Sequence, residues 1–136
     1  MSIRLVIVMA TAWVILECRY GTSVRNPTAP ELAAAIAELY HEDLPGMTQA
    51  DYEEHGAASL RYGFDDGPMF VISVTRGGVV TFEEWADQDY EQELHPPRVS
   101  KSFSEQQALE LWKCLGRGEI DVVRVLMEMG PGRLMA

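Results

Sequence analysis

The sequence is poor in cysteine and in basic residues. It has two cysteines in 136 residues, too few for a disulfide framework, and the single pair they could form is Cys18–Cys114. Lys and Arg total 11 against 21 Asp and Glu, which gives a formal net charge of −10. Because phosphate binding needs basic surface, this balance argues against direct binding to nucleic acid or to an anionic membrane, and it favours a basic partner.

The sequence also lacks a hydrophobic run long enough to cross a bilayer. Its longest one, Leu5–Leu16, has 12 residues, whereas a spanning helix takes about 20. Such a run is also typical of a secretory signal, but no small-x-small cleavage site follows it, and Glu17 stands before Cys18 where a lipoprotein signal has a small residue. We therefore predict two strands, Ile3–Met9 and Trp13–Tyr20, with the Cys18 side chain facing the core.

Motifs for catalysis or cofactor binding are missing as well. The sequence contains no G-x-S-x-G, Walker loop, dinucleotide fingerprint or H-E-x-x-H. The three histidines are isolated: His41 is expected to close a helix, His55 lies four residues after Asp51, and His95 precedes two prolines. We expect no enzyme activity, no metal site and no cofactor.

What is present predicts one globular domain over residues 1–136, with about the last six residues frayed. Thr28 and Glu31 form a capping box that begins a helix running to about His41. Ser104 and Gln107 form a second box, whose helix is expected to end at Gly116. Both helices carry one apolar stripe. The segment from Thr48 to His55 is either a loop or a short helix.

Three segments alternate apolar and polar residues, as antiparallel strands do: Ala58–Phe64, Met69–Thr75 and Val79–Glu84. The clean alternation predicts a sheet that is buried on one face and exposed on the other.

Two further segments complete the prediction. We expect His95-Pro96-Pro97 to end regular structure before a short edge strand at Arg98–Lys101. For Ile120–Met129 the β-branched residues favour a short strand, but a helical stripe can also be drawn, so a helix stays open. The fold class is then α+β: a two-layer domain with a mainly antiparallel sheet and two helices packed on one face.

The candidate binding residues lie in two acidic segments. The first, residues 83–94, has no basic residue, and it lacks the spacing of a calcium-binding EF-hand loop. It is either a solvated segment or a recognition surface in which aromatic anchors stand among carboxylates that attract a basic partner. The candidate residues are Glu83, Glu84, Trp85, Asp87, Asp89, Tyr90, Glu91 and Glu93, together with Asp51, Glu53 and Glu54 of the second segment.

The sequence resembles the immunity proteins of bacterial polymorphic toxin systems. The resemblance lies in an acidic α+β chain in which Asn26-Pro27-Thr28 opens an amphipathic helix, a meander turns at Arg76-Gly77-Gly78, and a late helix ends in Leu115–Gly118. It covers roughly residues 12–127 and rests on pattern and composition.

The resemblance implies a cytoplasmic antitoxin without a cofactor. Its partner is a cognate toxin domain, whose active site it covers. The acidic segment suits a basic toxin that acts on nucleotides or nucleic acid, with the carboxylates mimicking phosphate. Two alternatives stay open: a secretion chaperone, which is expected to be a dimer, and a small enzyme.

Overall fold

The computed structural model describes residues 12–42 and 45–134, and the predicted strand Ile3–Met9 lies outside them. Six strands form one sheet in the order β2-β1-β3-β4-β5-β6, and every neighbouring pair is antiparallel. The strands are β1 (Ala12–Glu17), β2 (Ser23–Arg25), β3 (Ala57–Phe64), β4 (Met69–Thr75), β5 (Val80–Trp85) and β6 (Glu93–Ser100).

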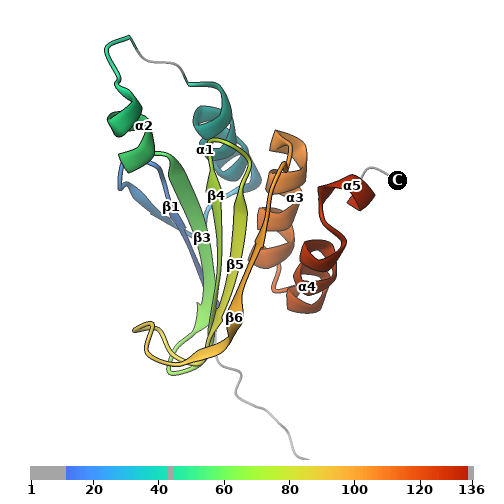
Figure 1. Cartoon of the computed structure of the whole chain (residues 1–136). Helices are drawn as coiled ribbons and strands as arrows, with labels where there is room; N and C mark the ends of the chain where they lie inside the picture. Colours follow the sequence, from blue (N-terminus) through green and yellow to red (C-terminus); the bar gives the residue numbers. More distant parts are fainter. Residues whose placement is uncertain (1–11, 43–44, 135–136) are drawn as a thin grey trace, which may run out of the picture.

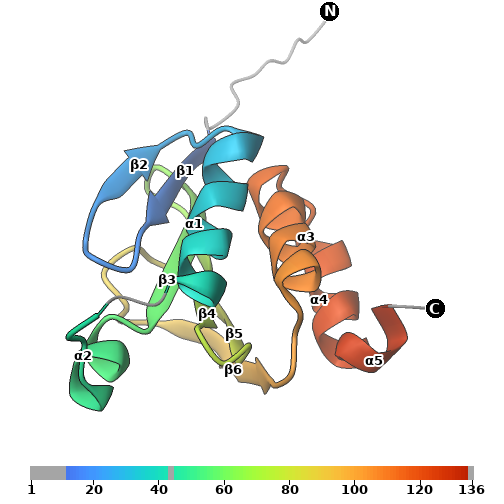
Figure 2. The same ribbon diagram turned by 90° about the horizontal axis from the view of Figure 1, so that it is seen from above.

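The helices are α1 (Ala29–His41), α2 (Gln49–Glu54), α3 (Glu105–Gly116), α4 (Ile120–Met129) and α5 (Pro131–Leu134). The three longest, α1, α3 and α4, lie on one face of the sheet, and α2 lies apart from them, before the first residue of β3 (Figures 1 and 2). α1 and α3 lie side by side against the sheet, and α4 packs against α3 near the β6 edge (Figures 1 and 2). The predicted fold class, an α+β domain with an antiparallel sheet and helices on one face, is therefore confirmed.

Both predicted capping boxes are present. The Glu31 backbone N–H donates to Thr28 Oγ1 at 3.3 Å, and the Thr28 N–H donates to Glu31 Oε1 at 2.8 Å. Ser104 and Gln107 make the same exchange at the start of α3. Thr48 and Asp51 make a third one, which shows that the segment from Thr48 to His55 forms the short helix α2 rather than a loop.

The main core lies between the helices and the sheet. Trp112 of α3 is fully buried there, and its indole N–H donates to the carbonyl of Ile72 on β4 at 3.1 Å. Because this bond satisfies the only polar atom of the ring, a large indole is accommodated without an unpaired donor.

The opposite face of the sheet is not simply exposed, so that prediction is wrong. Trp13, Met69 and Val71 form a second buried cluster there, with Ile15 and Trp85 packed against it. The cluster depends on Gly63, which pairs with Trp13 across β1 and β3. A Cβ at position 63 would lie 2.5 Å from Trp13 Cζ2, so glycine is what lets the indole lie flat over β3.

Near the C-terminus, the strand expected at Ile120–Met129 is corrected. Ile120–Met129 is helical, because the spacing of Val123 and Met127 turns both side chains into the main core, a stronger constraint than the β-propensity of its valines. α3 ends at Gly116, as predicted, and the glycine of positive φ that follows it is Gly118, at +75°. The expected frayed end contains α5, where the Pro131 carbonyl accepts from Gln107 Nε2 at 2.8 Å.

Regular structure does not end at Pro96-Pro97, because β6 runs through both prolines. A strand at the edge of a sheet has N–H groups that need no partner on the outer side, so proline is tolerated there. The other edge strand, β2, was not predicted; it has three residues and pairs with β1 after a tight turn at Gly21.

Candidate functional site

Two acidic turns meet at one end of the sheet. One joins β3 to β4 and contains Asp65 and Asp66; the other follows β5 (Figure 1). The side-chain amide of Gln88 donates to the carbonyl of Phe64 and so ties the two turns together. We call this surface the acidic end; its carboxylates are Asp65, Asp66, Asp87, Asp89 and Glu91.

The acidic end is hollowed on both sides of Gln88 and Asp89. A depression of about 320 Å³ lies between the two turns and is lined by Asp66, Asp87 and Asp89. A neighbouring one of about 350 Å³ opens on the face of the sheet that carries Trp13, with Arg25 and Arg61 on its other wall. The carboxylates therefore form a contoured surface.

Asp87 builds the second turn. Its side chain accepts the backbone N–H of Gln92 at 2.9 Å and that of Glu91 at 3.1 Å. These N–H groups, that of Gln92 first, hold the pKa of the Asp87 carboxyl below its usual value. Asp87 is thus a structural carboxylate as much as a surface charge.

An aromatic pair stands among these carboxylates. The rings of Trp85 and Tyr90 meet edge to face, with centroids 5.1 Å apart and planes at 79°. Trp85 is half-buried, and its indole N–H donates to Glu83 Oε1 at 3.2 Å. Tyr90 is 46% exposed. Two large aromatic side chains therefore stand among carboxylates, as the sequence predicted, and Asp89, Glu91 and Glu93 are exposed near them in the chain. Whether they bind a partner stays a prediction.

Glu84 does not belong to this surface, so its prediction as a binding residue is wrong. The residue is only 2% exposed, and its carboxylate receives Arg124 of α4 at 2.7 Å and lies 3.9 Å from Arg98 of β6. The alternation of β5 places Glu84 on the same face as Val80 and Phe82, toward the helices. The sequence pattern carried this signal, because a carboxylate two residues after a core phenylalanine on a strand points inward.

The second acidic segment lies elsewhere. α2 leads into the first residue of β3, whereas the acidic end lies beyond its last residue (Figure 1). An eight-residue strand spans roughly 23 Å, so Asp51 and Glu54 are not part of the same surface.

Asp51 also has a structural role. Its carboxylate accepts the Thr48 N–H at 2.9 Å, a bond that lowers the Asp51 pKa. Glu54 is exposed. The side chain of Glu53 lies outside the described residues.

Asp65 and Asp66 are the functional candidates that sequence reasoning missed. Asp-Asp-Gly is a typical hairpin-turn sequence, and it forms the turn here, with Asp66 at a φ of +57°. Nothing in the sequence states which other turn lies beside it. The sheet order decides this: because β3, β4 and β5 are consecutive antiparallel neighbours, the turn after β3 and the turn after β5 lie at the same end.

The groups that carry chemistry in hydrolases do not converge in the described residues. His41 is exposed at the end of α1 and lies 2.5 Å from Glu105. Burial raises the pKa of both the Cys18 and Cys114 thiols, and within residues 12–42 and 45–134 neither thiol has a hydrogen bond to a histidine.

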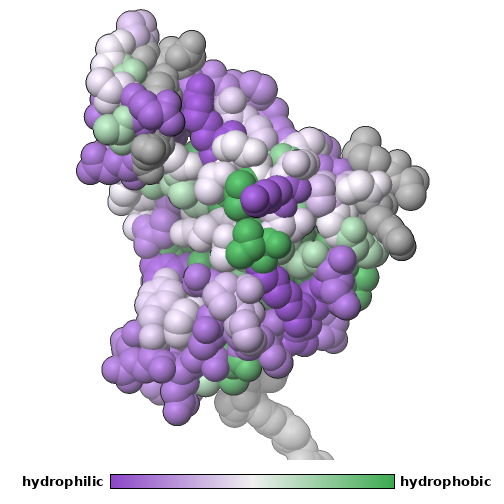
Figure 3. Space-filling model, in the orientation of Figure 1, coloured by the Kyte–Doolittle hydropathy of each residue, from purple (hydrophilic) through white to green (hydrophobic). Residues whose placement is uncertain are grey.

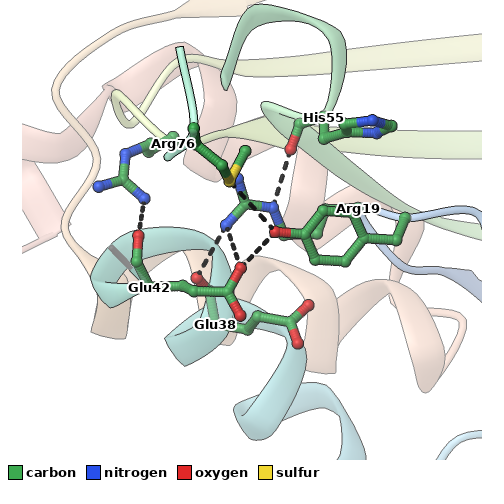
Figure 4. A network of polar contacts seen from close by, with 7 residues as sticks. Arg19, Glu38, Glu42, His55 and Arg76 are labelled. Atoms are coloured by element: carbon green, nitrogen blue, oxygen red, sulfur yellow. Dashed lines mark hydrogen bonds and ion pairs between the residues drawn. The ribbon is translucent and has the colours of Figure 1, made fainter. Parts of the chain in front are cut away.

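His55 belongs to a polar network around Arg19 that links α1 to the start of β3 (Figure 4). The Arg19 guanidinium donates to the His55 carbonyl at 2.9 Å, to the Glu38 carbonyl at 3.3 Å and to Glu42 Oε1 at 3.2 Å. Arg76 donates to the Glu42 carbonyl. Arg19 is 5% exposed, and the His55 and Glu38 acceptors are backbone carbonyls, so the network holds the fold together at this end.

A larger depression, of about 470 Å³, lies where α1 begins and α3 ends. Its lining includes Lys113 and Arg117 but no carboxylate, histidine or cysteine. Lys113 and Arg117 are each paired with a glutamate outside this lining, at 3.7 and 3.1 Å. It therefore lacks the convergent reactive groups of a catalytic site.

The surface also carries apolar residues near the β6 edge. Figure 3 shows them as patches within a mainly polar face. Exposed charged residues of α4, such as Asp121 and Glu128, lie among them. The exposed members are Leu94 and Val99 of β6 and Val122, Val125 and Met129 of α4.

Asp87, Asp89 and Glu91 can bring one carboxylate oxygen each to within 4.8 Å of the others. Both oxygens of Asp87 are already acceptors of backbone N–H groups, so we do not assign a metal centre.

Among the described residues, no helix has the length and apolar character needed to cross a membrane. Comparisons with protein-family models, with curated proteins and with solved structures find no match for this chain.

Proposed function

We propose that this chain is an immunity-type binding protein. It binds a basic, toxin-like protein through the acidic end and covers that protein's active site, in the cytoplasm of the cell that it protects. The observation that carries the proposal is the meeting of two acidic turns, distant in sequence, around the Trp85–Tyr90 pair. Aromatic residues are typical anchors of protein interfaces, and surrounding carboxylates speed the encounter with a basic partner.

The edge strands of the sheet are poorly suited to pair with a strand of a partner protein, which favours binding of the partner at the acidic end. β2 has only three residues, and β6 contains Pro96 and Pro97, which cannot donate to a new neighbour. Short edges and edge prolines oppose pairing with another chain. A partner is therefore better accommodated by side chains at the acidic end.

Only part of the charge at this end has basic neighbours: Arg25 and Arg61 line one of its depressions, and Arg61 is paired with Glu17 at 2.8 Å. The sequence from position 77 to position 97 contains no lysine or arginine. Glu84, the one fully buried carboxylate of this stretch, is the one that receives arginines from other elements. The exposed carboxylates are left to attract a partner, over a range of about 8 Å at physiological salt.

The first test is affinity capture of the tagged chain from its native cell lysate at about 0.15 M salt, with identification of stoichiometric partners by mass spectrometry. A single basic partner with a toxin-like domain supports the proposal. Secreted effectors that share an unfolded segment would instead support a chaperone.

The second test compares two double variants that change the net charge equally. Asp65→Lys with Asp89→Lys alters both turns of the acidic end, while Glu54→Lys with Glu128→Lys alters exposed residues of α2 and α4. We expect the first pair to slow association about tenfold and to weaken protection from the partner's toxicity, and the second pair to change the rate less than twofold. Equal effects of the two pairs would show that only net charge matters and would overturn the site.

A further inference from the structure

Tyr90 has a backbone conformation that bulky residues seldom adopt. Its φ is +59°, in the left-handed region, where the Cβ of an L-residue crowds the backbone. The turn tied by Asp87 imposes this conformation, since Asp87 accepts the N–H groups of Glu91 and Gln92. Glycine or asparagine would fit the position with less strain. The ring is 46% exposed, so the burial of its apolar surface does not offset the backbone strain as it would for a core residue.

The ring is nevertheless held in place. It meets the indole of Trp85 edge to face, with centroids 5.1 Å apart. Trp85 is fixed in turn, because it packs against the cluster of Trp13, Met69 and Val71 and donates to Glu83. An exposed aromatic ring that is already oriented loses little conformational entropy when a partner binds it.

The surroundings of the ring fit a cation, and among cations a guanidinium. Asp89 and Glu91 flank Tyr90 in the chain and are exposed. Within the described residues neither forms an ion pair with a lysine or arginine, although Arg25 and Arg61 line the same depression as Asp89. A planar guanidinium can stack on an aromatic face while its edge donates to carboxylates. A lysine ammonium is compact and more strongly hydrated, so it gains less from the ring.

We propose that Tyr90 is the specificity-determining residue of the acidic end and that it stacks on an arginine side chain of the partner, with Asp89 and Glu91 accepting from the guanidinium. This inference rests on the proposed function for the nature of the partner. It goes further by naming the chemical group that is recognised.

The experiment uses two defined probes, a hexa-arginine and a hexa-lysine peptide, titrated by calorimetry into the whole chain at about 0.15 M salt. The peptides have equal charge, so they differ only in the cationic group. We expect wild type to bind the arginine peptide three- to fivefold more tightly, the range of an exposed cation–π contact. Tyr90→Asn is expected to abolish this preference, mainly by weakening the binding of the arginine peptide, because lysine gains less from the ring. Tyr90→Phe, which keeps the ring, is expected to retain it.

Thermal unfolding separates a loss of the ring from a loss of the fold. Because asparagine tolerates a positive φ, the melting temperature of Tyr90→Asn is expected to equal or exceed that of wild type. Ser102→Asn is the matched control, since Ser102 has a φ of +67° and lies between β6 and α3. It is expected to show the same thermal behaviour and an unchanged peptide preference.

A measurement on wild type alone needs no variant to fold. In NMR spectra of the complex with the arginine peptide, we expect nuclear Overhauser contacts between the Tyr90 ring protons and arginine side-chain protons. Their absence, equal affinity for the two peptides, or an unchanged preference in Tyr90→Asn would each overturn the assignment.

The outcomes also distinguish this inference from the proposed function. If wild type and Tyr90→Asn capture the same basic partner from lysate equally well, the role of Tyr90 fails and the binding function stands. If the peptide preference depends on the ring but no toxin-like partner is captured from cells that express one, the proposed function fails and the recognition of arginine stands.

Discussion

Removing Arg124 tests how far the free energy of unfolding falls when the buried carboxylate of Glu84 loses its partner. Glu84 is 2% exposed, and Arg124 reaches it with two nitrogens, Nη2 at 2.7 Å and Nε at 3.2 Å. Arg98 lies 3.9 Å from the same carboxylate. In Arg124→Ala the carboxylate therefore keeps only the more distant arginine.

The magnitude follows from the burial of the two partners. Breaking a fully buried pair costs about 3–5 kcal/mol. The Arg124 side chain is 35% exposed, and water can enter the space that it leaves, so we expect a loss of about 2–3 kcal/mol in the free energy of unfolding. For a chain of this length that corresponds to a fall in melting temperature of roughly 10 °C.

The assay is urea unfolding at pH 7, followed by circular dichroism, on Arg124→Ala and on the double variant Glu84→Leu with Arg124→Leu. Replacing a buried pair with apolar residues of similar volume is often neutral, so the double variant is expected to recover most of the loss. A cost below about 0.5 kcal/mol for Arg124→Ala, or a double variant less stable than the single one, would refute the view that an unpaired buried charge is the source of the effect.

Two further perturbations test the second cluster and the acidic turn. Gly63→Ala places a Cβ 2.5 Å from the Trp13 ring, so we expect a loss of about 1–3 kcal/mol by urea unfolding; an unchanged midpoint would mean that the indole shifts freely. The pKa of Asp87 in the folded protein lies below its ordinary value of 3.8. The ionised carboxylate therefore stabilises the fold at a pH above 3.8, and this contribution is lost as the pH falls through the lower pKa of the folded state. Compared with wild type, Asp87→Asn should therefore be less stable at pH 6 and nearly equal at pH 2 in thermal unfolding, and a gap independent of pH would contradict the assigned hydrogen bonds.

The carboxylates of residues 83–94 show how an interpretation from neighbouring residues alone fails without the tertiary contacts. Residues 83–94 form one acidic run in the sequence, and strand alternation distinguishes only Glu84 among its carboxylates. The fold gives them different roles: Glu84 is a buried ion-pair partner, Asp87 ties a turn, and Asp89 and Glu91 remain exposed. A variant that reversed Glu83, Glu84, Asp87 and Asp89 together would therefore damage the fold as well as the surface.

The sequence by itself determined the elements whose signals are local. Capping boxes begin α1 and α3, and alternation with tight turns defines β3, β4 and β5, because these signals arise from hydrogen bonds and side-chain spacing within a few residues. The α+β class followed from the apolar stripe on each helix and from the sheet that they cover.

The tertiary structure decided what depends on contacts between distant segments. It made Ile120–Met129 a helix, since packing against α3 outweighs the preference of valine for strands, and it extended β6 through two prolines, since an edge strand needs no donor on its outer side. It also placed Asp65 and Asp66 beside the turn of Tyr90. That proximity follows from strand order, a property of the whole sheet that no short stretch of sequence encodes.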